Sequence, residues 1–250
     1  MRVALFATCL VDNLRPRIGL ASARLLQDHG CEVVVPPSQT CCGQPGYNNG
    51  DVRGARALAR KTITEFEGFD YVVVPSGSCA GMIIQHYPRL FRDEPDWRAR
   101  AESLAARCHE LTHFLSHVLD IRLDRTFEGR VTYHDSCSSL RELGIHGAPR
   151  TLLSQMHGLV LLEMKETEVC CGFGGTFSVK FDEISERMAS NKTRRVRETG
   201  ADVLAAADLG CLLNIAGRLR REDGGPRIFH IAELLAGMAD GAGIGGPDKA

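Results

Sequence analysis

The chain has 250 residues, of which 44% are hydrophobic and 24% are charged. Such a composition is typical of a globular protein with one large domain or two of ordinary size. The formal net charge of -1 gives no reason to expect nucleic acid or an anionic membrane as a partner, and no apolar run approaches the roughly 20 residues of a membrane span.

The first half of the chain alternates short β-branched runs with helical stretches. We expect strands at 3–6, 32–35 and 71–74, and helices at 16–29, 52–66, from about 80, and 97–119.

The second half repeats this order, with strands expected at 130–133, 159–162 and 202–205 and helices at 149–156, 183–198 and from about 212. Strands alternating with helices indicate βαβ units and parallel sheets. We therefore predict an α/β protein of two tandem Rossmann-like βαβ domains, related by internal duplication. The expected domains are 1–127 and 128–236, followed by a Gly- and Asp-rich tail at 237–250 that we expect to be disordered.

A cysteine pattern occurs once in each half. A single cysteine is followed after 32 or 33 residues by Cys-Cys-Gly, and a last cysteine follows that pair after 37 or 40 residues. The two sets are Cys9, Cys41, Cys42 and Cys79 in the first half, and Cys137, Cys170, Cys171 and Cys211 in the second. A duplicated constellation is much harder to reach by chance than a single short motif.

The cysteines fall where the predicted strands have just ended, and both Cys-Cys-Gly elements precede helices. Ligands of open parallel sheets gather beyond the carboxyl ends of the strands. We therefore expect the eight thiols to converge into two clusters, one in each half.

Four convergent thiols leave three interpretations: an iron–sulfur cluster in each half, a structural zinc ion in each half, or thiol–disulfide chemistry without a metal. The first apolar run is short and reads as a strand rather than an export signal, so we expect the reducing cytoplasm, where paired cysteines favour metal or redox chemistry over structural disulfides. Short zinc knuckles are missing from the sequence, and adjacent cysteines suit a wide cluster better than a small tetrahedral ion. The glycines after the pairs, Gly43 and Gly172, also permit close backbone approach.

These motifs resemble the cysteine-rich domain family that is named for its Cys-Cys-Gly core, whose members include iron–sulfur subunits of oxidoreductases. The full family pattern ends in Cys-x-x-Cys, but Ser76 and Asp208 occupy the earlier of those two positions here. With four thiols in each half, the resemblance implies up to two ordinary [4Fe–4S] clusters, held by all eight cysteines of the sets. We expect Ser76 and Asp208 to be turn or capping residues.

Three segments, at 75–81, 170–179 and 210–215, are similar to family members that take part in L-lactate oxidation. The resemblance implies a cytoplasmic electron-transfer subunit of a system that oxidises L-lactate to pyruvate. Its implied partners are a ferredoxin-like iron–sulfur subunit and a third small subunit. The alternatives are a subunit that oxidises glycolate or another 2-hydroxy acid, and a zinc or thiol redox-sensing scaffold.

Residues outside the sets are less informative. No dinucleotide fingerprint, phosphate loop or catalytic triad is present, so no catalytic residue is assigned. We expect no ligand role for two cysteines without counterparts in the other half and for three histidines spaced four apart on one predicted helix: Cys31, Cys108, His109, His113 and His117.

Two residues just before Cys137 have two interpretations. His134 and Asp135 either tune the second cluster or move protons, or they satisfy backbone groups at a strand end.

Overall fold

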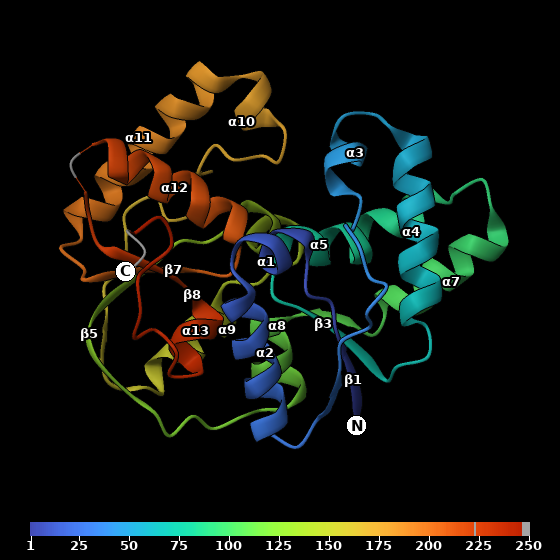
Figure 1. Cartoon of the computed structure of the whole chain (residues 1–250), viewed down its shortest axis with the longest axis horizontal. Coiled ribbons are helices and arrows are strands. Elements are labelled where there is room, and N and C mark those ends of the chain that lie inside the picture. The colour runs from blue at the N-terminus through green and yellow to red at the C-terminus, as the bar shows by residue number, and fades with distance from the viewer. Residues whose placement is uncertain (223, 247–250) are drawn as a thin grey trace.

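The computed structural model describes residues 1–222 and 224–246. It contains two four-stranded sheets, both entirely parallel, with strand orders β2-β1-β3-β4 and β6-β5-β7-β8. The two orders match position by position, which confirms the α/β class and the duplication. Figure 1 shows the outer helices of the first half on the right and those of the second half on the left.

The elements of the first half are β1 (Arg2–Leu5), α1 (Cys9–Leu14), α2 (Pro16–Asp28), β2 (Glu32–Val34), α3 (Gln44–Asn48), α4 (Val52–Phe66), β3 (Tyr71–Val74), α5 (Gly77–Gly81), η1 (Met82–His86), α6 (Tyr87–Leu90), α7 (Pro95–Ala105), β4 (Cys108–Glu110), α8 (Leu111–His113) and η2 (Phe114–Val118). The elements of the second half are β5 (Thr126–Tyr133), η3 (Ser138–Glu142), α9 (Gly147–Ser154), β6 (His157–Leu161), α10 (Phe177–Lys180), α11 (Asp182–Glu198), β7 (Val203–Ala206), α12 (Leu209–Arg221), β8 (Arg227–His230) and α13 (Ile231–Leu235). The segments η1, η2 and η3 are π-helical.

The long helices form as their sequences dictate. The Asp51 side chain accepts a hydrogen bond from the Gly54 amide at the start of α4, and apolar side chains spaced four apart, such as Ala55, Ala59 and Ile63, are buried. The helix α11 carries acidic residues in its first turn and arginines in its last, which complements the helix dipole.

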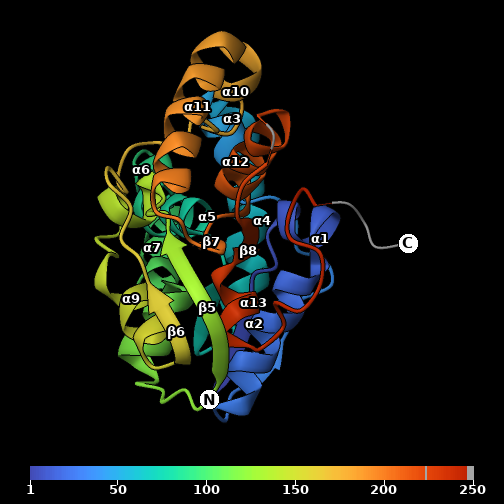
Figure 2. The ribbon, with the colours of Figure 1, turned by 90° about the vertical axis from the view of Figure 1, so that its left-hand side faces the viewer.

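The helices of each half pack reciprocally on the other half. The contacts of α2 with α13 and of α1 with α12 mirror those of α9 with α8 and of η3 with α5. Both views show α2 beside α13 (Figures 1 and 2). One apolar core includes Leu5 and Ile18 of the first half together with Val131 and Leu204 of the second. The two sheets are thus joined by a shared core, an arrangement expected of a duplicated fold with approximate twofold symmetry.

The structure differs from the sequence prediction at four places. The helix expected at 97–119 is interrupted by β4, which places Cys108 and His109 in an edge strand, and β8 was not predicted. The domain boundary expected after residue 127 falls inside β5.

The fourth difference concerns the tail, for which we expected disorder over 237–250. Residues 237–246 are packed on the second half: Ala239 and Ile244 are buried, and the Ile244 amide donates to the Ile228 carbonyl at 2.8 Å. Residues 247–250 lie outside the described part of the chain.

In the described ranges, no helix has both the length and the apolar character that crossing a bilayer would need.

Candidate metal centres

The structure brings the first four predicted cysteines together at the carboxyl ends of β1, β2 and β3. Cys9 begins α1, Cys41 and Cys42 lie in the loop between β2 and α3, and Cys79 lies in α5. The Sγ atoms of Cys42 and Cys79 are 3.3 Å apart, and Cys41 contacts both Cys9 and Cys42. We call these four residues the first thiol set.

The second thiol set, formed by Cys137, Cys170, Cys171 and Cys211, has the same arrangement around β5, β6 and β7. Its thiols contact one another in the same series, from Cys137 to Cys170, Cys171 and Cys211. All ten cysteines are free thiols. Each half therefore offers four sulfur donors at one edge of a parallel sheet, and their role as ligands stays a prediction.

Hydrogen bonding within each set concentrates negative charge on one sulfur. Hydrogen bonds with Cys42 and Cys9 lower the pKa of Cys41 to about 2, and those with Cys137 and Cys171 lower the pKa of Cys170 to about 2. The same contacts raise the pKa of Cys9 and Cys137. Because thiolates are the form that binds metals, each set has one sulfur ready to bind, and loading a metal would release the protons of the others.

The glycine after each cysteine pair directs a backbone N–H group at sulfur. Gly43 and Gly172 have φ of 87° and 86°, and their amides lie 3.4 Å from the Sγ atoms of Cys41 and Cys170. Only glycine adopts this left-handed conformation without strain. Each pair thereby gains a hydrogen-bond donor to a sulfur ligand, and such donors tune the reduction potential of a metal centre.

The two glycines differ in the space around them, which predicts different effects of alanine. A Cβ on Gly172 would lie 2.8 Å from the Ser185 carbonyl oxygen, whereas a Cβ on Gly43 would meet Leu58 at 3.4 Å. We expect Gly43→Ala to cost about 1–2 kcal/mol for its backbone conformation, and Gly172→Ala to cost about 1–3 kcal/mol more because of the clash. Anaerobic urea unfolding of the two variants measures the difference, and equal losses would contradict it.

The first thiol set borders a cavity that both halves enclose. All four of its cysteines line this space of about 200 Å³, and Phe173, Thr176 and Asp208 close it from the second half. A second cavity of about 390 Å³ reaches Cys9 and Cys41 from the side of residues 35–40. Four thiols around one cavity, with a backbone donor at one sulfur, fit a cysteine-ligated cluster.

The positions where the family has a further cysteine carry structural contacts. Ser76 caps α5 by accepting a hydrogen bond from the Cys79 amide at 3.4 Å, as predicted. Asp208, at the start of α12, ties the halves together: its carboxylate accepts hydrogen bonds from the Ser78 amide at 2.9 Å and the Ser78 hydroxyl at 3.3 Å. The polar groups at these two positions therefore bond to protein groups that flank the thiol sets.

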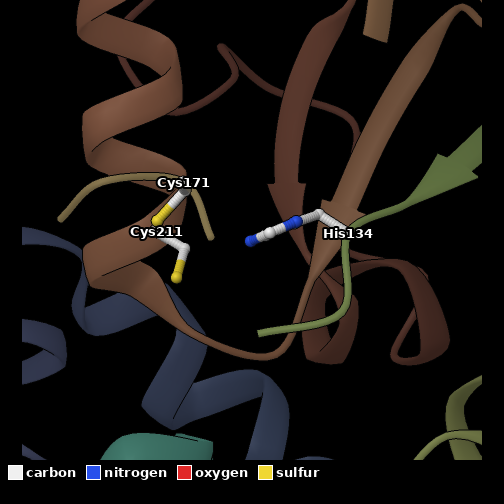
Figure 3. A group of neighbouring side chains, drawn as sticks. All are labelled: His134, Cys171 and Cys211. Carbon is white, nitrogen blue, oxygen red and sulfur yellow. The ribbon is translucent and has the colours of Figure 1, made fainter. Parts of the chain in front are cut away.

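His134 and Asp135 have different surroundings. The Arg150 guanidinium donates two hydrogen bonds to the buried Asp135 carboxylate, at 3.0 and 2.8 Å, and Thr167 Oγ1 adds a third at 3.2 Å. These contacts place the Asp135 carboxylate in a buried ion pair, and both interpretations of its role stay predictions. The His134 imidazole points instead toward Cys171 and Cys211 (Figure 3).

Sequence reasoning missed Lys192, which lies in the middle of the polar helix α11. Its ammonium is buried and donates to the carbonyls of Glu166 and Thr167 at 2.6 and 3.2 Å. Burial lowers its pKa, and the nearby Cys171 opposes that shift. A positive charge thus lies beside the second thiol set, and no local feature of a helix rich in charged residues distinguishes it.

The residues for which we expected no ligand role lie outside both thiol sets. Cys31 and Cys108 are buried, and burial raises the pKa of each. The rings of His109, His113 and His117 stack with centroids 5.4 and 4.6 Å apart, but His109 belongs to β4 and only the other two lie on helical backbone.

Comparison with known proteins agrees with the repeated geometry. The model of a family described as "Cysteine-rich domain" matches twice, at residues 3–84 and 131–216. Proteins named "Lactate utilization protein A" from Bacillus licheniformis and Bacillus subtilis are 49% and 47% identical to this chain over 236 residues, which cover 94% of it and 99% of each relative.

A solved structure supports the fold. A hypothetical protein from Helicobacter pylori superposes with a TM-score of 0.68 at 13% identity, covering 96% of this chain. The chain spans about half of that protein, 49% of its length.

Proposed function

The chain belongs to the cysteine-rich domain family, and on that premise we propose that it is the iron–sulfur subunit of a system that oxidises L-lactate to pyruvate. Two observations support the proposal: the two sets of four contacting thiols, and relatives of nearly the same length that are named for lactate utilisation. The single observation that carries it is the duplicated thiol geometry.

In this proposal the eight cysteines of the thiol sets hold the clusters, one in each half of the chain. When bound, [4Fe–4S] clusters would supply one-electron chemistry. The chain itself holds the sulfur ligands, directs the Gly43 and Gly172 amides at them, and restricts water by burying Cys42 and Cys171. The cavity beside the first set provides space next to all four of its sulfurs.

Oxidation of lactate releases two electrons, whereas a four-iron cluster passes on one at a time. The two clusters could take one electron each and would then have to pass both on, and we propose as partners a ferredoxin-like iron–sulfur subunit and a third small subunit in the cytoplasm. Glycolate or another 2-hydroxy acid would need the same electron relay, so a growth experiment distinguishes the substrates. Deletion of the gene is expected to abolish growth on L-lactate and to spare growth on glycolate.

Metal analysis tests the proposal most directly. We expect the anaerobically purified chain to hold about eight iron and eight sulfide ions, the content of two four-iron clusters. Zinc at full occupancy without acid-labile sulfide would contradict the proposal and support the alternative of a zinc-binding scaffold. Thiols that hold no metal and oxidise reversibly in pairs would indicate the redox sensor.

A further inference from the structure

His134 is a buried histidine whose ring makes no hydrogen bond of standard geometry. Its exposed fraction is 0%, both ring nitrogens lack such a bond in the described structure, and the polar group that acts on the ring at close range is the Thr167 backbone. An unpaired polar atom in the protein interior costs free energy. A buried ring without hydrogen bonds therefore points to another binding partner, such as a ligand or a metal.

The ring lies at the second thiol set. A nitrogen of His134 and the Sγ atoms of Cys171 and Cys211 all lie within 4.8 Å of one another. Figure 3 shows the imidazole extending from the end of β5 toward the helix that carries Cys211. Three donor atoms, two sulfurs and one nitrogen, thus face a common point.

Burial favours the neutral form of the ring. Together with the Lys192 ammonium it lowers the pKa of His134 to about 4, against the opposing effects of Asp135, Cys170 and the Thr167 backbone. A neutral imidazole has a free lone pair on one nitrogen, which is the form that binds metal ions.

The first half provides an internal comparison. The His134 amide donates to the Ala205 carbonyl and the Phe6 amide donates to the Val73 carbonyl, both at 2.9 Å, and each residue precedes the first cysteine of its set by three positions. The two residues are therefore equivalent in the duplicated fold. Phe6 packs in an apolar core with Cys42 and Cys79, so the fold fills this position with an apolar ring where no ligand is needed.

We propose that His134 is a ligand of the metal centre in the second thiol set, acting together with Cys171 and Cys211, while the first set binds through cysteine alone. The inference rests on the proposed function for the presence of a metal, but it concerns only the ligands of one centre. In this arrangement the imidazole takes the place of one of the four thiolates assigned to the second set above, which makes that centre less negative and raises its reduction potential. The two centres of this chain would then differ in potential.

The test uses the full chain with Cys42→Ser, in which the first set is incomplete and the retained metal occupies the second. X-ray absorption at the edge of that metal is expected to show nitrogen as well as sulfur neighbours. Adding His134→Phe, which copies the first half, should remove the nitrogen and most of the bound metal. The control is His117→Phe, which replaces an exposed ring. It should change neither the nitrogen signal nor the amount of bound metal.

A retained metal with only sulfur neighbours while His134 is present would overturn the inference and leave the proposed function standing. Zinc with nitrogen and sulfur neighbours would support the ligand and contradict the iron–sulfur function. A chain that binds no metal after anaerobic iron loading would overturn both.

If the Cys42→Ser chain does not fold, pulsed electron paramagnetic resonance of the reduced wild-type protein labelled with ¹⁵N-histidine gives the same answer. A strong ¹⁵N coupling that is lost in His134→Phe supports ligation. A spectrum unchanged by that substitution contradicts it.

Discussion

Replacing Cys171 with serine is expected to empty the second thiol set and leave the first one loaded, which halves the iron and sulfide content of the chain. Cys171 is 1% exposed and contacts both Cys170 and Cys211, so it lies in the middle of the series of sulfurs. A serine hydroxyl is a harder ligand than a thiolate and a poor donor to an iron–sulfur cluster. Iron would fall from about eight to about four ions per chain.

Cys42→Ser should have the reciprocal effect, because Cys42 occupies the equivalent place in the first set, 3.3 Å from the Cys79 sulfur. Cys31→Ser is the matched control: Cys31 is also buried but belongs to neither set. Iron, acid-labile sulfide and visible absorbance of anaerobically purified variants measure the result. Loss of all iron in either variant would show that the sites do not load independently, and unchanged iron in both would refute the ligand assignment.

Sequence patterns predicted the inner strands because their apolar, β-branched residues are local signals. Residues such as Val72, Val73 and Val74 are buried on both faces of a parallel sheet, and the expected and observed bounds of β3 agree. The edge strand β4 has the sequence Cys-His-Glu, which carries no such signal. It is extended because it pairs with β3, and long-range pairing is not encoded in three residues.

The thiol sets could be anticipated because each cysteine lies in the segment that follows a strand, and parallel strands end at one edge of the sheet. Lys192 could not, since it reaches the second set from the third turn of α11, whereas the place of His134 just before Cys137 already makes tuning of that set one of its interpretations. Aligning the two halves provides a signal for His134, because Phe6 is its counterpart. Comparing equivalent positions of the two halves therefore shows how the two centres differ, which neither half shows by itself.

Arg150 forms a buried ion pair that only the structure shows. Replacing Arg150 should be among the most destabilising single substitutions in the chain. Its guanidinium bridges the buried Asp135 and the more exposed Glu163, with N–O distances of 2.7 to 3.0 Å. In Arg150→Met the Asp135 carboxylate keeps the Thr167 hydroxyl and a longer contact, 3.9 Å, with the exposed His146 ring. Leaving a buried charge unpaired costs about 3–5 kcal/mol, a large part of the total stability of a typical domain.

Two companion variants separate this effect from a general loss of charge. Arg130→Met breaks an exposed pair with Asp202, where solvent screens the interaction, so it should leave the midpoint of anaerobic urea unfolding unchanged. Adding Asp135→Asn to Arg150→Met removes the stranded charge and should recover part of the lost stability. Equal midpoints for the two arginine variants would contradict the buried ion pair. A double variant no more stable than Arg150→Met would instead assign the loss to the packing of Arg150 over the Tyr133 ring, 5.6 Å from its centre.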